Sequence, residues 1–277
     1  MFLAACVQLC CTTDQERNLD TAERLIRRAA QMGAKLVATP ENTPFLGPQF
    51  HKVSLAEPLD GPIGRRFAAL ADELGIYLLL GSMAEQRVLP DGAIDEQRCH
   101  NTSAFYGPDG KLRAVYRKMH LFDVDVPGGL TIRESDTVAA GEHVVVVDTD
   151  LGTMGLTICY DLRFPELYRA LVDRGVDLIF IPSAFTLTTG KDHWHALLRA
   201  RAIETQCFVL APAQWGVHDE HGKRQSYGHS AIIDPWGVVL ADRGHGEGLC
   251  LAEIDLERAA AVRRAIPVRD HRRLNTL

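Results

Sequence analysis

Short apolar segments alternate along this chain with longer segments whose apolar residues recur at helical spacing. Between residues 15 and 32 the apolar side chains fall every three or four positions, which predicts a helix that ends at Gly33. The same criteria predict further helices at 63–74, 164–174 and 192–205, and strands at 2–8, 36–38, 76–82, 144–148, 153–158, 177–182, 207–211 and 249–254.

Two further regions, 99–118 and 228–241, have the pattern of β-hairpins, each with a turn that contains Gly and Pro. Residues 119–143 are irregular and rich in Asp, Pro and Gly, which is typical of a functional loop. Some strands are flanked by helices and others by hairpins. We therefore expect one α/β domain over residues 1–277, in which two mixed sheets pack face to face with helices on their outer faces.

The composition is that of an ordinary globular protein, with 46% hydrophobic and 24% charged residues in a chain of 277. The formal net charge of −6 comes without a basic stripe, which argues against nucleic acid as a partner. No apolar run approaches the roughly 20 residues of a membrane span, and the apolar start of the chain lacks the positive segment of a signal peptide. We expect a protein that binds neither nucleic acid nor a membrane.

The chain has seven cysteines, and no pair of CxxC motifs is present among them. An odd number with this spacing does not support a zinc site. Several cysteines lie in apolar runs and are expected to be small core residues. Free thiols are typical of a reducing compartment, so we expect a cytoplasmic protein. The cysteines are Cys6, Cys10, Cys11, Cys99, Cys159, Cys207 and Cys250.

Cys159 differs from the others because it ends the segment Gly-Leu-Thr-Ile-Cys-Tyr-Asp at 155–161, just before the helix predicted at 164–174. At such a junction the N-terminus of the helix is expected to lower the thiol pKa. The N–H of Tyr160 could also stabilise a developing oxyanion. A buried structural cysteine is the alternative interpretation.

Two charged residues follow predicted strands in contexts suited to catalysis. Glu41, in Pro-Glu-Asn, comes directly after the strand at 36–38, where a buried carboxylate can act as a general base. Lys118, in Arg-Lys-Met-His-Leu-Phe, ends the first predicted hairpin and could stabilise a thiolate or polarise a carbonyl. Taken singly, each is more easily explained as an ordinary loop or surface residue.

Taken together, Glu41, Lys118 and Cys159 in these contexts resemble the Glu-Lys-Cys triad of the nitrilase superfamily. The resemblance extends over nearly the whole chain and includes the hairpin region at 228–237. It implies a four-layer α-β-β-α sandwich and a homodimer or higher homo-oligomer. It also implies that Glu134, in Thr-Ile-Arg-Glu-Ser, is a second catalytic glutamate that orients Lys118 or positions the attacking water.

The chemistry that this resemblance implies is amide hydrolysis through a thioester. Glu41 accepts the proton of Cys159 and later protonates the leaving amine. The N–H of Tyr160 and the ammonium of Lys118 hold the oxyanion. Glu41, with help from Glu134, then activates the water that cleaves the thioester. No metal ion or organic cofactor is expected.

Within the superfamily the chain most resembles the small Nit-type amidases, which act on side-product amides of keto acids. The resemblance rests on the stretches at 120–128, 199–206 and 226–230 and on the tail at 266–273. The Ser-Tyr-Gly-His-Ser segment and the preceding Ala-Gln-Trp-Gly favour deaminated glutathione as the substrate. The ω-amidases, which act on α-ketoglutaramate, share the Asp-Val-Asp-Val-Pro-Gly loop and are the close alternative.

Both substrates carry a carboxylate next to a ketone, which a cation near the thiol should bind. Arg163 is the candidate, with a structural ion pair to Asp161 or Glu166 as the alternative interpretation. Phe185 and Thr189, by resemblance in position, are expected to line the substrate pocket, with ordinary loop packing as the alternative.

Other functional classes fit the sequence less well. A metal-dependent amidohydrolase needs clustered His and Asp ligands, whereas His193 and His195 are two apart on a predicted helix and cannot share a face. A non-catalytic interaction module of the same fold is expected to lack Cys159 or Lys118. A nitrilase proper, or another amidase of the superfamily, shares the triad and stays open.

Overall fold

Two six-stranded sheets form the centre of the computed structural model, which describes residues 1–125 and 131–274. The strands of the first sheet are β1 (Phe2–Gln8), β2 (Ala34–Ala38), β3 (Tyr77–Val88), β4 (Ile94–Tyr106), β5 (Leu112–Arg117) and β16 (Gly248–Ile254). Their order is β16-β1-β2-β3-β4-β5. Strands β1, β2 and β3 run parallel, and the remaining neighbours pair antiparallel.

The second sheet repeats this plan. Its strands are β8 (Val145–Thr149), β9 (Gly152–Leu156), β10 (Leu178–Phe180), β11 (Phe208–Ala211), β14 (Ala231–Ile233) and β15 (Val239–Asp242). The order is β15-β14-β11-β10-β9-β8, with β9, β10 and β11 parallel. Two small ladders lie outside both sheets: β6 (Asp123–Asp125) with β7 (Thr131–Arg133), and β12 (Trp215–Val217) with β13 (Gln225–Tyr227).

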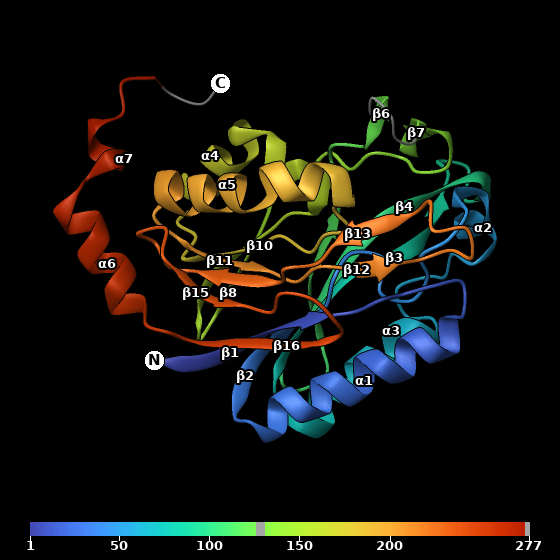
Figure 1. Cartoon of the computed structure of the whole chain (residues 1–277), viewed down its shortest axis with the longest axis horizontal. Helices are drawn as coiled ribbons and strands as arrows, with labels where there is room; N and C mark the ends of the chain where they lie inside the picture. Colours follow the sequence, from blue (N-terminus) through green and yellow to red (C-terminus); the bar gives the residue numbers. More distant parts are fainter. Residues whose placement is uncertain (126–130, 275–277) are drawn as a thin grey trace.

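Helices cover the outer face of each sheet. Figure 1 shows α1 (Gln15–Gln31) and α3 (Pro62–Leu74) beneath the first sheet, and α4 (Pro165–Val172) and α5 (Leu187–Thr205) above the second. The predicted four-layer α-β-β-α sandwich of two mixed sheets is therefore confirmed. The remaining helices are α2 (Gln49–Ser54), α6 (Leu256–Ala265), α7 (Val268–His271) and two short 3-10 helices, η1 (Glu134–Asp136) and η2 (Cys159–Arg163).

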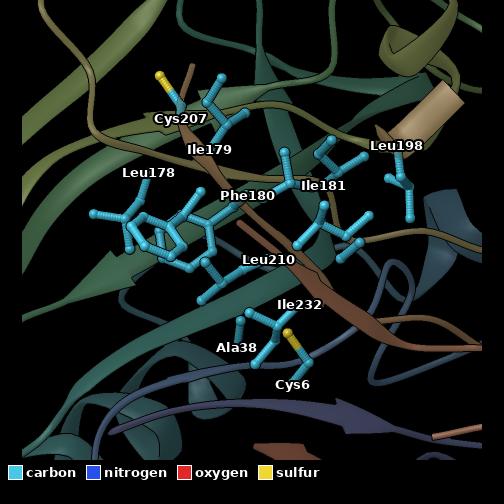
Figure 2. Packing of buried hydrophobic residues seen from close by; sticks show 14 of the residues in the cluster. Cys6, Ala38, Leu178, Ile179, Phe180, Ile181, Leu198, Cys207, Leu210 and Ile232 are labelled. Carbon is cyan, nitrogen blue, oxygen red and sulfur yellow. The ribbon is translucent and has the colours of Figure 1, made fainter. Parts of the chain in front are cut away.

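Alternation of side chains along the strands divides the buried residues between two cores. In β1, Ala4 and Cys6 belong to the core between the sheets, whereas Ala5 and Val7 pack with α1 and α3. Figure 2 shows the core between the sheets, where Cys6 lies beside Ile232 of β14. The small side chains on β1 allow the two sheets to approach closely, which brings the loops at their edges together.

Most predicted elements are present, and the differences concern short or polar segments. α1 ends before Gly33 as predicted, and that glycine adopts a φ of 93°. α5 begins at Leu187 rather than at 192. The sequence pattern does not predict α2, β12 or β13, because such short elements show no period. The region 119–143 contains β6, β7 and η1, and its residues 126–128, part of the Nit-type stretch, lie outside the described residues.

Within the two described ranges, no helix is both long enough and apolar enough to cross a membrane.

Candidate active site

Loops from both sheets converge on one cavity of about 550 Å³. Glu41 follows β2 and Cys159 follows β9, both near the carboxyl ends of parallel strands, where sites in α/β proteins usually form. Lys118 comes directly after β5, and Glu134 begins η1. The cavity is lined by every site residue predicted from the sequence: Glu41, Lys118, Glu134, Cys159, Tyr160, Arg163, Phe185 and Thr189.

Lys118 is held between two buried carboxylates. Its Nζ donates to Glu41 Oε1 at 2.9 Å and to Glu134 Oε2 at 2.8 Å, and all three side chains are buried. Burial by itself would lower the pKa of Lys118, but the charges of Glu134 and Glu41 outweigh it and hold that pKa well above its ordinary value. Lys118 is therefore a cation throughout the neutral range.

Asn101 of β4 joins the same two carboxylates. Its Nδ2 donates to Glu41 Oε1 at 2.9 Å and to Glu134 Oε1 at 3.1 Å. Its backbone carbonyl accepts the N–H of Lys118 at 2.9 Å. One residue thus fixes the positions of both anions and of the cation between them. The sequence contains no motif that marks Asn101, only a polar position in a strand that becomes buried at this point.

Backbone N–H groups also donate to the two carboxylates. The N–H of Ala184, just after β10, donates to Glu41 Oε2 at 2.9 Å, and the N–H of Phe122 donates to Glu134 Oε2 at 2.8 Å. Burial by itself would raise the pKa of Glu134, but the charge of Lys118, with that of a second lysine, lowers it to about 2. Glu134 is thus a fixed anion that orients Lys118.

Cys159 is the first residue of η2 and lies at the sharp turn that follows β9. Its φ of 48° is in the left-handed region, which few residues other than glycine adopt. Its own N–H donates to the carbonyl of Pro182 at 2.9 Å and is not free to bind an oxyanion. Asp161 Oδ2 accepts the N–H of Ile158 at 2.8 Å, which closes the turn. These bonds hold the thiol at the wall of the cavity.

The prediction that a helix N-terminus lowers the thiol pKa is wrong. Cys159 begins only the short η2, and α4 does not start until Pro165. Cys159 is 8% exposed, and burial raises its pKa well above the ordinary value. The charge of Glu41 adds to this rise, and that of Lys118 opposes it. The resting group is a neutral thiol, on which the charges of Glu41 and Lys118 act in opposite directions.

Arg163 lines the cavity. The alternative interpretation from the sequence was a structural ion pair with Asp161 or Glu166. Its guanidinium lies 5.2 Å from the centroid of the Phe185 ring and 3.3 Å from Nδ1 of His193. None of the ion pairs between described residues joins Arg163 to Asp161 or Glu166. Within the described part of the chain, the guanidinium therefore has no carboxylate partner of its own.

Two smaller features complete the wall near the thiol. Among the described residues, the N–H of Tyr160 has no protein acceptor, so it remains available beside Cys159. The hydroxyl of Thr189 is 2.8 Å from that of Thr186, at the start of α5. Tyr160 thus offers a donor where an oxyanion would form, and Thr189 offers a hydroxyl that is already part of a hydrogen bond.

Three further cations line the cavity, and the sequence contains no motif that marks them. Lys52 comes from α2, and Lys223 and Arg224 come from the connection between β12 and β13. Burial lowers the pKa of Lys52, although the charges of Glu134 and Glu41 oppose this. In the described part of the chain, the side chains of these three cations form no hydrogen bond or ion pair. The sequence pattern does not predict α2, β12 or β13, and so it does not place these three cations.

The histidines of α5 face different partners. His193 contacts Arg163, whereas His195 Nε2 lies 2.7 Å from Asp242 Oδ2, which also lies near His229 Nδ1. His195, His229 and Asp242 have ligand-type atoms within 4.8 Å of one another, a grouping that could hold a metal ion. These three residues are not part of the cavity lining. The expectation that the protein has no metal site stays a prediction.

Comparison of the sequence with known proteins finds a family model and relatives that match nearly the whole chain. A family model described as carbon-nitrogen hydrolase matches residues 3–264. A deaminated glutathione amidase of Synechocystis sp. is 44% identical over 98% of this chain and 98% of its own. An omega-amidase of Xenopus tropicalis is 40% identical over 98% of this chain and 95% of its own.

Solved structures show the same fold. The NitFhit protein of Caenorhabditis elegans superposes with a TM-score of 0.88 and 40% identity, over 98% of this chain and 65% of that one. An amidase from Nesterenkonia sp. AN1 superposes with a TM-score of 0.77 and 25% identity, over 98% of this chain and 100% of that one. That amidase was solved as a mutant with acrylamide added at its active-site cysteine.

The pKa of Cys159 can be measured from the ultraviolet absorbance of its thiolate, after subtraction of the same titration on Cys159→Ser. We expect a midpoint above about 8.5, the ordinary value for a cysteine, because burial disfavours the anion. In Glu41→Gln the neighbouring negative charge is gone, so the midpoint should move to lower pH. A midpoint below neutral pH in the native protein would contradict this description of the resting site.

Proposed function

Because the chain belongs to the carbon-nitrogen hydrolase family of the nitrilase superfamily, we propose that this hydrolase cleaves the amide bond of a small keto acid through a thioester on Cys159. The observation that carries the proposal is the buried grouping of Glu41, Lys118 and Glu134 beside that thiol in one cavity. The Nesterenkonia amidase, whose active-site cysteine was modified by acrylamide, supports the choice of nucleophile.

In the first half of the reaction, Cys159 becomes acylated. Glu41 takes the thiol proton as Sγ attacks the amide carbonyl, so that a neutral resting thiol becomes a nucleophile only when substrate is in place. The N–H of Tyr160 and the ammonium of Lys118 stabilise the negative charge on the carbonyl oxygen. Glu41 then delivers the proton to the amine nitrogen, and the carbon–nitrogen bond breaks.

In the second half, water removes the acyl group. Glu41, ionised again, accepts a proton from water as the water oxygen attacks the thioester carbonyl. Glu134 holds Lys118 in place during both steps, because it bonds the ammonium and has no proton to give at neutral pH. The sulfur of Cys159 leaves and recovers its proton from Glu41. This scheme requires neither a metal ion nor an organic cofactor.

The cations near the thiol favour an acyl group with a carboxylate. Arg163, which has no carboxylate partner of its own among the described residues, is placed to bind the carboxylate of a 2-keto acid. Phe185 lies under the guanidinium and is 5% exposed, so it holds Arg163 in position. Thr189 offers its hydroxyl to the carboxylate of the substrate. These three substrate-binding roles belong to the proposal.

Deaminated glutathione is the substrate we propose, because a relative of that name matches this chain over nearly its full length. α-Ketoglutaramate, the substrate of an ω-amidase, is the alternative, and a protein named omega-amidase is almost as similar. Another amidase activity, or a nitrilase activity, would use the same triad. A non-catalytic interaction module is disfavoured because the cavity keeps a complete set of catalytic groups.

The seven cysteines are all free, which supports a reducing compartment, and we place the protein in the cytoplasm on that ground. Its partner in this proposal is the small amide itself, with neither nucleic acid nor a membrane involved.

The test compares amine release from deaminated glutathione and ammonia release from α-ketoglutaramate on one preparation. We expect kcat/KM for deaminated glutathione to be at least about tenfold higher, a difference of about 1.4 kcal/mol in transition-state binding. In Cys159→Ala, both values should fall on the order of 10³-fold or more, because the nucleophile is lost. Cys207→Ala, which changes a buried cysteine of the core, is the matched control and should stay active.

Hydrolysis by Cys159→Ala at the native rate would refute the thioester mechanism. A preference of tenfold or more for α-ketoglutaramate would keep the mechanism and replace the proposed substrate.

We also propose a homodimer, because apolar side chains are exposed where α5 meets the β14–β15 hairpin. Arg199 of α5 donates to the carbonyl of Gly237 at 2.9 Å, so the two elements are in contact. A second copy of this chain is the occupant we propose for the patch. The patch consists of Ile203, Trp236, Val238 and Leu240, with exposed fractions of 42% to 49%.

Trp236→Glu places a charge within this patch and should convert the dimer to a monomer, which sedimentation equilibrium can measure. Val88→Glu, at a 63% exposed position on β3 outside the patch, is the control and should remain dimeric. A native protein that is monomeric at micromolar concentration would contradict the proposed dimer.

A further inference from the structure

The cavity carries an excess of positive charge although the whole chain has a net charge of −6. Its lining contains two carboxylates, Glu41 and Glu134, and these are balanced by two buried lysines. Lys118 bonds to both carboxylates, and Lys52 acts on them through its charge. Among the described residues, three cations of the lining form no ion pair with a carboxylate: Arg163, Lys223 and Arg224.

The backbone next to Arg224 is fixed at the cavity wall. It precedes β13, which pairs with β12. Ser226 of β13 forms a bridge with Thr186, and the N–H of Tyr227 donates to the carbonyl of Phe185 at 2.9 Å. The hairpin that carries Arg224 is thereby joined to the loop that leads from Ala184 into α5. Its position relative to the thiol is set by backbone hydrogen bonds.

Asp219 acts on the Arg224 guanidinium through its charge, but its carboxylate oxygens bind backbone groups. The carboxylate of Asp219 accepts the backbone N–H groups of His221, Lys223 and Arg224 at 3.1, 2.9 and 2.9 Å. It therefore shapes the loop, and within the described residues it forms no ion pair with the guanidinium. A partly buried guanidinium keeps its charge and is stabilised when an anion with two oxygens binds to it.

The two candidate substrates have the same acyl group and differ in the amine that leaves. α-Ketoglutaramate releases ammonia, whereas deaminated glutathione releases the dipeptide cysteinylglycine, which ends in a second carboxylate. Two extended residues span at most about 7 Å, so this carboxylate would lie well within a cavity of about 550 Å³.

On the basis of the proposed function, we propose that Arg224, with Lys223 beside it, binds the C-terminal carboxylate of the leaving dipeptide. Arg163 then binds the carboxylate of the acyl group near the thiol, and Arg224 binds the carboxylate at the opposite end of the substrate. Ammonia, the leaving group of α-ketoglutaramate, has no carboxylate that could bind to this second subsite. Arg224 is thus a specificity-determining residue that favours peptide amides with a free carboxylate over primary amides.

The test uses deaminated glutathione and its C-terminal carboxamide. The two compounds differ only in the negative charge of the C-terminal group that Arg224 is proposed to bind. For the native enzyme we expect kcat/KM to be at least about tenfold higher for the carboxylate, as one charge-assisted pair would give. Arg224→Gln should reduce this ratio to about two or less, and Arg224→Lys should restore part of it. Arg163→Gln should lower both values and leave the ratio high.

Arg113→Gln is the matched surface control, because Arg113 pairs with Asp109 in the β4–β5 turn outside the cavity lining, and its ratio should equal that of the native enzyme. Equal kcat/KM values for the two compounds in the native enzyme, or equal losses for both in Arg224→Gln, would overturn the subsite while the amidase proposal stands. If the native enzyme hydrolyses neither compound, the proposed substrate fails, and the subsite fails with it.

Discussion

The contact of Lys118 with two buried carboxylates is the interaction on which the site depends. Glu41 and Glu134 would repel each other if they were buried alone, and a buried lysine would tend to lose its proton. Each charge is stable here because the others are present, and removal of one member of such a buried set typically costs about 3–5 kcal/mol. Glu41, Lys118 and Glu134 are therefore held in place before a substrate arrives.

The packing of the two sheets brings this charged group to the thiol of Cys159. Glu41 follows a strand of the first sheet and Cys159 follows a strand of the second. The N–H of Ala184, which follows β10 of the second sheet, donates to the Glu41 carboxylate. Gln214 Nε2 also donates to the backbone carbonyl of Glu41 at 2.9 Å. Small side chains on β1, such as Cys6, allow this approach (Figure 2). Packing between the sheets and these bonds thus place Glu41 and Cys159 in the wall of one cavity.

The sequence was sufficient to predict the α-β-β-α sandwich, because its longer helices and buried strands have clear periods. It also predicted that Glu41, Lys118 and Cys159 lie together, since each follows a strand in a recognisable context. It did not predict the protonation state of the thiol, which depends on burial beside Glu41 rather than on a helix. Lys52 was missed because α2 is too short to show a pattern, and Arg224 was missed because it lies in the connection between two short strands.

The central claim is that Cys159 carries the acyl group, and rapid quenching in acid followed by mass spectrometry tests it most directly. Deaminated glutathione and α-ketoglutaramate share one acyl group. We therefore predict that whichever of them turns over adds the same mass, that of the keto-acid acyl group, to the peptide containing Cys159. Amine released in the first turnover with no added mass on that peptide, or with the mass on another cysteine, would contradict the account.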